Sequence, residues 1–116
     1  MSKNNKLLMV VAFIVLIILI ITYFKNNNSV EIDEETIRCI ASNSHLYVKE
    51  GCHYCVEQET ILGNYTSLFN ITECTQNIEE CKNVLGVPFS IPTWIINNQQ
   101  YIGAKSLNEL KSLTGC

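Results

Sequence analysis

The feature that most constrains this chain is an uncharged apolar run near its N-terminus. Residues 7–24, LLMVVAFIVLIILIITYF, contain no charged side chain over 18 positions. A helix of this length rises about 27 Å, close to the roughly 30 Å hydrocarbon core of a bilayer. A buried core helix would need a far larger protein around it, and no polar stripe interrupts the run. The run therefore predicts one membrane-spanning helix.

A cleaved signal peptide is the main alternative to a permanent anchor. Its apolar core is usually about 7–15 residues long and is followed by a cleavage site with small residues. Here the run is longer, and it ends in Tyr23, Phe24 and Lys25 without such a site. The pattern favours an uncleaved signal-anchor.

The charges around the run predict its orientation. Lys3 and Lys6 precede it, whereas Lys25 alone follows it closely, and positively charged flanks stay in the cytoplasm. We expect a single-pass membrane protein whose domain lies outside the cytoplasm, in a periplasm-like space, at the cell surface or in the ER lumen. Its parts would be a cytoplasmic N-terminus at 1–6, a transmembrane anchor at 7–24, a polar tether at 25–30 and an extracytoplasmic domain at 31–116.

The composition of the exported part narrows its function. The chain has 116 residues and a net charge of −3, and all eleven acidic residues follow the anchor. An acidic domain gives no basis for nucleic-acid binding. All six cysteines also lie there, in a compartment that is usually oxidising enough for disulfides to persist.

The exported part alternates between helix and strand patterns. Gly63 is suited to a helix C-cap, and Asn77 with Glu80, like Ser106 with Glu109, forms a capping-box pattern. Apolar spacing predicts helices at 31–41, 55–63, 77–86 and 106–115, strands at 45–49 and 67–74, and a hairpin at 93–103 with its turn near 97–99. This order predicts a small α/β domain in which helices flank a central sheet.

The motif GCHYCVEQ, residues 51–58, separates Cys52 from Cys55 by two residues. A zinc site would need a second cysteine pair at short spacing. Cys74 and Cys81 are too widely spaced to supply one, so we expect no metal. A purely structural Cys52–Cys55 disulfide stays open as an alternative, although it would close a small ring, and strained bridges are the reducible ones.

A strand followed by CxxC at the start of a helix favours redox chemistry. The first sulfur then lies beside unpaired N–H groups and the positive end of the helix dipole, which stabilise a thiolate. The thiolate is the form that attacks disulfides. Cys52 is therefore the expected attacking sulfur, and Cys55, one turn further on, the shielded resolving sulfur.

A second motif, SIPTWII, places Ile91, Pro92 and Thr93 just ahead of a strand. Most X–Pro bonds are trans, and Ile-Pro alone is commonplace. Combined with the upstream strand, CxxC and helix, the motif resembles the cis-proline loop of the thioredoxin superfamily. That resemblance implies a thioredoxin-like fold and a substrate-binding loop at these three residues, facing the CxxC.

A narrower resemblance covers the whole exported part. The segments YVKEGCHYCVEQETILG, ECTQNIEEC and IPTWIINNQQYIGAKSLNELKSLTGC resemble the thioredoxin-like domain that is fused to, or partners, bacterial and archaeal vitamin K epoxide reductase homologues. The resemblance implies catalytic roles for Cys52 and Cys55 and a DsbA-like role in disulfide formation. It also implies a structural disulfide between Cys74 and Cys81.

Six cysteines allow 15 pairings, of which we expect Cys52–Cys55, Cys74–Cys81 and Cys39–Cys116. Cys74 and Cys81 would be about 10.5 Å apart on one continuous helix, too far for a disulfide, so Cys74 has to precede the helix. The Cys39–Cys116 bond would tie the first helix of the domain to the last residue of the sequence.

The chain departs from the family pattern in three respects. His-Tyr stands between the cysteines in place of Pro-His, so the redox poise of the family does not carry over. Leu46 stands where thioredoxin has a buried acid, and one anchor cannot supply the quinone-reducing membrane helices of the fused proteins.

We therefore expect a membrane-anchored thiol–disulfide oxidoreductase without a cofactor of its own. It would pass disulfides to exported cysteine-containing proteins, and a separate membrane redox protein resembling vitamin K epoxide reductase would reoxidise it. The sequence does not separate the oxidase, isomerase and reductase directions. The alternative is a disulfide-stabilised interaction module that uses the fold without turnover.

Overall fold

A computed structural model describes residues 2–26 and 32–116. Most of the predicted tether at 25–30 and the first residue of the predicted 31–116 domain lie outside the described residues, as does Met1. The chain divides into two compact units, Met1–Glu31 and Ile32–Cys116, which we describe separately.

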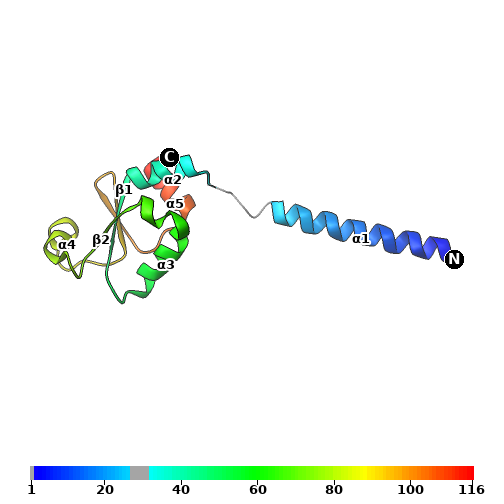
Figure 1. Cartoon of the computed structure of the whole chain (residues 1–116), viewed down its shortest axis with the longest axis horizontal. Helices are drawn as coiled ribbons and strands as arrows, with labels where there is room; N and C mark the ends of the chain where they lie inside the picture. The colour runs from blue at the N-terminus through cyan, green and yellow to red at the C-terminus, as the bar shows by residue number, and fades with distance from the viewer. Residues whose placement is uncertain (1, 27–31) are drawn as a thin grey trace. The chain divides into compact units, whose positions relative to one another are not determined.

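The first unit contains helix α1, Lys3–Asn26 (Figure 1). It contains the whole predicted span at 7–24 and extends a few residues past each end of that span. Among the described residues it is the one helix long and apolar enough to cross a membrane, and none of its apolar window is buried in the protein. A signal sequence near the N-terminus also meets these criteria of length and hydropathy, so α1 is a candidate span.

The second unit is a mixed α/β domain with a four-stranded sheet. Its elements are α2 Glu34–Ser42, β1 Ser44–Val48, α3 His53–Leu62, the 3₁₀ helix η1 Gly63–Leu68, β2 Asn70–Glu73, α4 Ile78–Leu85, β3 Thr93–Ile96, β4 Gln99–Ile102 and α5 Leu107–Thr114. The strand order is β2-β1-β3-β4, with β1 parallel to β2, and β3 antiparallel to both β1 and β4. This topology is consistent with the expected thioredoxin-like fold.

Alternating strand residues build a core on each face of the sheet. Leu46 and Trp94, which pair across β1 and β3, belong to the larger core, together with apolar residues of α2, α3 and α5. Tyr47, the next residue of β1, packs with the Cys74–Cys81 disulfide and Leu85 of α4 in the smaller core. Helices α2, α3 and α5 therefore cover one face and α4 the other (Figure 1).

Local signals in the sequence account for several element ends. Ser106 and Glu109 form the predicted capping box at the start of α5. Asn97 and Asn98 both have positive φ in the hairpin turn between β3 and β4, the backbone conformation that two-residue hairpin turns require and asparagine tolerates. Gly63 ends α3 with φ of 55°, a region that an L side chain rarely adopts.

Two expectations about local structure were wrong. Asn77 makes no side-chain cap for α4, because its amide Nδ2 donates instead to the carbonyl of Glu73 at 2.9 Å. Residues 67 and 68 belong to η1 rather than to a strand. The hydroxyl of Thr66 donates to the carbonyl of Gly63 at 2.7 Å and keeps the chain turning before β2 begins at Asn70.

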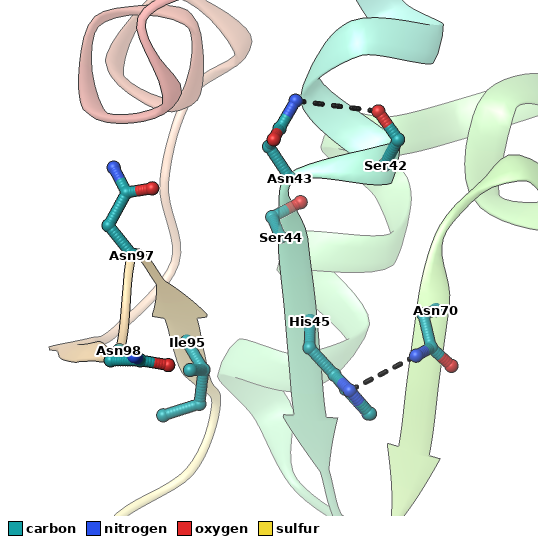
Figure 2. Close-up of a pocket in the computed structure, with 8 residues that line it drawn as sticks. All are labelled: Ser42, Asn43, Ser44, His45, Asn70, Ile95, Asn97 and Asn98. Atoms are coloured by element: carbon teal, nitrogen blue, oxygen red, sulfur yellow. Dashed lines mark hydrogen bonds between the residues drawn. The ribbon is translucent and has the colours of Figure 1, made fainter.

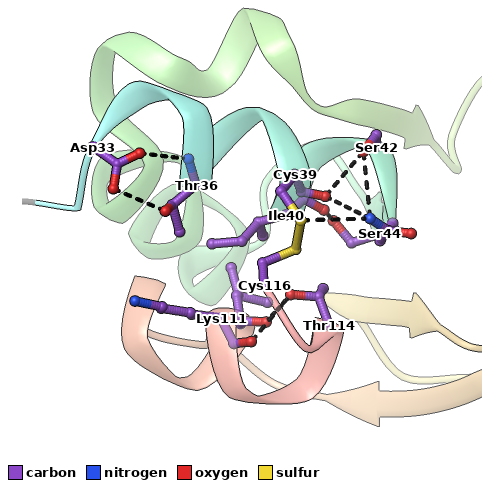
Figure 3. The surroundings of a disulfide bond; sticks show 11 residues. Asp33, Thr36, Cys39, Ile40, Ser42, Ser44, Lys111, Thr114 and Cys116 are labelled. Carbon is purple, nitrogen blue, oxygen red and sulfur yellow. Dashed lines mark hydrogen bonds between the residues drawn. A yellow bond between two sulfur atoms is a disulfide. The ribbon is translucent and has the colours of Figure 1, made fainter.

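All six cysteines are paired, in the three pairs expected. Cys39–Cys116 joins α2 to the last residue, just beyond α5 (Figure 3), with the two Cα atoms 5.9 Å apart. Cys74 follows β2 and precedes α4, which brings its Cα within 5.8 Å of that of Cys81. The cysteines of this second pair are fully buried.

Candidate functional site

The Cys52–Cys55 disulfide lies at the N-terminus of α3. Cys52 is the N-cap residue, and its Sγ accepts a hydrogen bond from the N–H of Cys55 at 3.2 Å. An N-cap sulfur lies beside the unpaired N–H groups of the first turn and at the positive end of the helix dipole. Both would stabilise a thiolate on Cys52 once the disulfide is reduced.

The two cysteines differ in exposure. Cys52 is half-buried, whereas Cys55 is 3% exposed and packs within the larger core. His53 and Tyr54 between them face solvent, and Tyr54 is 61% exposed. A thiolate from another molecule can therefore reach Cys52 but not Cys55.

The Ile91–Pro92–Thr93 segment lies beside Cys52. The carbonyl oxygen of Ile91 is 4.0 Å from the Sγ of Cys52; the sulfur carries no hydrogen in the disulfide, so this is a contact and not a hydrogen bond. The Ile91–Pro92 bond is cis, and so is the Val87–Pro88 bond earlier in the same loop.

The three predicted loop residues are not equally accessible. Ile91 is half-buried, Pro92 is fully buried and Thr93 is 1% exposed. The hydroxyl of Thr93 donates to the carbonyl of Ser90 within the loop. The Thr93 side chain therefore stabilises the loop and is not exposed to a substrate. Of the three side chains, that of Ile91 is the one open to solvent.

Two clefts adjoin the CxxC. The first, which we call the proline cleft, has α3 on one wall and the loops around Pro92 and Gly103 on the other; it is lined by Tyr54, Glu57, Ile91, Pro92, Ile102, Gly103 and Ala104. The second, which we call the glutamate cleft, is lined by Val48, Lys49, Glu50, Gly51, Cys55, Val56, Glu59, Glu73 and Gln76. The surface near Cys55 is thus acidic, and the proline cleft is mainly apolar.

Glu73 holds the loop that leads into the CxxC. Its carboxylate accepts hydrogen bonds from the N–H of Glu50 at 2.8 Å and from that of Gln76 at 3.1 Å. Desolvation raises the pKa of Glu73, but hydrogen bonds from Glu50, Thr75 and Gln76 together outweigh it and hold the pKa below its ordinary value. The charged carboxylate therefore stabilises this loop.

Leu46, the residue expected to stand in place of a buried acid, is fully buried. Among residues 2–26 and 32–116, no group of three or more histidine, cysteine or acidic side chains is placed to hold a metal ion.

A separate polar pocket lies at the opposite end of β1 from the CxxC. Figure 2 shows it between the turn at Asn97–Asn98 and the start of β1, with the side chains of His45 and Asn70 directed toward each other. Its lining residues are Ser42, Asn43, Ser44, His45, Asn70, Ile95, Asn97 and Asn98.

His45 belongs to a hydrogen-bonded chain that the sequence did not reveal. The hydroxyl of Thr72 donates to Glu80, so His45 Nε2–H donates to Thr72 at 2.7 Å, and Nδ1 accepts from Asn70 at 3.1 Å. This pattern fits a neutral imidazole, and burial lowers the pKa of His45 although Glu80 opposes the shift. Burial, followed by the charge of Glu80, raises the pKa of Tyr47, which stacks on His45.

No protein-family model matches the sequence, and no match was found among curated proteins. Among solved structures, the NTD_N/C domain of alkylhydroperoxide reductase AhpF from Enterococcus faecalis is similar, with a TM-score of 0.45 and 17% identity. The alignment covers 73% of this chain and 45% of that one, so this chain spans less than half the length of that structure. A likeness this distant decides neither fold nor function.

Proposed function

We propose that this chain is a membrane-anchored thiol–disulfide oxidoreductase that uses Cys52 and Cys55 to exchange disulfides with exported proteins. The observation that carries the proposal is the asymmetry of the pair. Cys52 caps a helix and is accessible, and Cys55 is buried one turn away. A disulfide that served only to staple the fold would need neither the exposed sulfur nor the cleft beside it.

In the oxidase direction, a substrate thiolate attacks Sγ of Cys52. A bond forms between the substrate sulfur and Cys52, the Cys52–Cys55 bond breaks, and Cys55 leaves as a thiolate that takes up a proton. A second substrate thiolate then attacks the substrate sulfur of this mixed disulfide and releases Cys52 as a thiolate. The substrate loses two electrons and gains a disulfide, and the CxxC gains both electrons and becomes a dithiol.

The N-terminus of α3 favours this direction. It stabilises the Cys52 thiolate, which lowers the free energy of the reduced protein relative to the oxidised one. A pair whose reduced form is stabilised is an oxidant. The magnitude of this effect decides between an oxidase and a more reducing enzyme.

The substrate backbone is expected to bind beside the loop at Ile91. Its carbonyl lies close to Cys52 and can accept a hydrogen bond from an extended substrate segment. Pro92 and Thr93 are buried, so they determine the conformation of the loop and their side chains are not expected to contact the substrate. The apolar surfaces of Tyr54 and Ile102, each about three-fifths exposed, suit an apolar side chain next to the substrate cysteine.

Membrane attachment and reoxidation form the second part of the proposal. Helix α1 would anchor the chain with residues 1–6 in the cytoplasm and the domain outside, as the flanking lysines favour. A reduced CxxC must return two electrons to another disulfide. A membrane-bound thiol oxidase resembling vitamin K epoxide reductase would supply that disulfide and pass the electrons on.

The experiment is to trap the mixed disulfide in cells. Cys55→Ala removes the resolving thiol, so adducts between Cys52 and substrates should accumulate and disappear when a reductant is added to the gel sample. Cys52→Ala should form no adducts. The matched control is Ser112→Ala, a change of similar size at an exposed position of α5, which should form no more adducts than the unchanged chain.

Adducts that persist in Cys52→Ala would contradict the assignment of the attacking sulfur. If neither variant forms adducts, and the unchanged chain binds partners without disulfide exchange, the domain is an interaction module instead.

A further inference from the structure

Gln58 is an unusual residue in the core of the domain. It lies on α3, three residues after Cys55, and it is fully buried beside otherwise apolar residues. Burying an amide costs free energy unless its hydrogen bonds are satisfied. The hydrogen-bond partners of Gln58 therefore show how the cost of burying its amide is offset and which segments the amide connects.

The amide of Gln58 makes three hydrogen bonds. Oε1 accepts from the indole Nε1–H of Trp94 at 2.9 Å and from the backbone N–H of Lys105 at 2.6 Å. Nε2 donates to the backbone carbonyl of Lys105 at 3.0 Å. The reversed amide would point its NH₂ group at two donors, so the network itself determines the orientation.

These partners lie on continuations of the two segments that line the proline cleft opposite α3. Trp94 is two residues after Pro92 on the same segment. Lys105 follows Gly103 and Ala104, and the N–H of Gly103 donates to the carbonyl of Pro92 at 2.8 Å. Gln58 thus connects the helix that carries both cysteines to the two segments that face it across the cleft.

From this arrangement we propose that Gln58 is a positioning residue for thiol–disulfide exchange. It holds the CxxC helix in register with the loop at Ile91–Pro92, so that a peptide bound to the loop presents its sulfur to Cys52. Apolar contacts tolerate small shifts between packed surfaces, whereas hydrogen bonds of fixed direction do not. The inference rests on the proposed function and adds a specific role within it.

The test compares two dithiol substrates with the oxidised full-length chain in detergent. One is a linear peptide with two cysteines, which needs the loop for alignment. The other is dithiothreitol, a small dithiol that needs an accessible Cys52 sulfur alone. In each reaction the CxxC disulfide is reduced to a dithiol, and the substrate dithiol is oxidised to a disulfide.

Gln58→Met fills a similar volume without the three hydrogen bonds. It should slow the peptide reaction about tenfold relative to the small dithiol, the order of effect that a displacement of under 1 Å has on oriented reactants. The control is Leu62→Ala, because Leu62 is buried on the same helix and does not line the proline cleft. It should lower stability while leaving the ratio of the two rates unchanged.

Trp94→Phe provides a second variant in case Gln58→Met does not fold. It removes the indole donor and keeps both bonds to Lys105, so the rate ratio should fall by a smaller factor. Equal slowing of both substrates in these variants, or an equal change of the ratio in Leu62→Ala, would overturn the positioning role. If the unchanged chain oxidises neither dithiol, the proposed function fails and this inference fails with it.

Discussion

Opening the Cys39–Cys116 disulfide is expected to cost much of the stability of the 32–116 unit. The two cysteines are separated by 77 residues. In the chain-entropy description, a disulfide that closes a loop of this length disfavours the unfolded state by about 4.5 kcal/mol. A domain of this size has a total stability of about 4–13 kcal/mol, so the loss brings the domain close to its unfolding threshold.

The geometry gives little reason to reduce this figure. The Cα atoms are 5.9 Å apart, inside the usual range for a disulfide. Both cysteines are half-buried, so alanine at either position leaves only a small cavity. The cost therefore comes mainly from the opened loop, and either single substitution should produce nearly all of it.

A double-mutant cycle measures this directly. Cys39→Ala, Cys116→Ala and the double variant are unfolded in urea, with the emission of Trp94, the only tryptophan and fully buried, as the signal. Sucrose in every sample preserves a folded baseline for the weakest variant. The three variants should lose the same free energy, about 4.5 kcal/mol each. Additive single effects, or a double variant that loses less than about 1 kcal/mol, would refute the reasoning.

Three further predictions follow from the structure. Ser106→Ala removes the N-cap of α5 and should lower the free energy of unfolding by about 1 kcal/mol, measured by urea titration; no change would mean that the cap is dispensable. The pKa of His45 is lower in the folded chain than in the unfolded chain, so on acidification the unfolded chain takes up the proton first, and the free energy of unfolding should fall as the pH drops below about 6.5. His45→Gln should make the free energy of unfolding less dependent on pH in this range. An unchanged pH dependence in this variant would mean that other groups cause it. A membrane-impermeant lysine reagent should label the 32–116 unit on intact cells, and labelling only after lysis would reverse the proposed topology.

The sequence predicts the fold where local chemistry and tertiary packing agree. Ser106 with Glu109 caps α5 as the spacing indicates, and Asn97–Asn98 supplies the hairpin turn because asparagine tolerates positive φ. At Asn77, local chemistry and tertiary packing disagree. The spacing to Glu80 resembles a capping box, but the amide bonds to the end of β2 instead. A spacing rule contains no information about competing partners from another element.

The candidate site was predictable only in part, for a related reason. Cys52, Cys55 and the Ile91–Pro92 segment carry motifs, and the structure brings Cys52 and Ile91 together. Gln58 carries none: a polar residue on a helix normally indicates a solvated face. Its role depends on Trp94 and Lys105, which are 36 and 47 residues away in sequence. The hydrogen-bonded chain from His45 to Glu80 was missed in the same way.

The central claim is that Cys52–Cys55 is a redox-active pair and not a staple. Its most direct test is the reduction potential of each disulfide, obtained by equilibrating the full chain in redox buffers, alkylating free thiols and mapping the modified peptides by mass. We predict that Cys52–Cys55 titrates between about −270 and −120 mV, the range of thioredoxin-like catalysts, while the other two pairs resist reduction. A Cys52–Cys55 potential below about −300 mV, together with the structural pairs, would contradict the account.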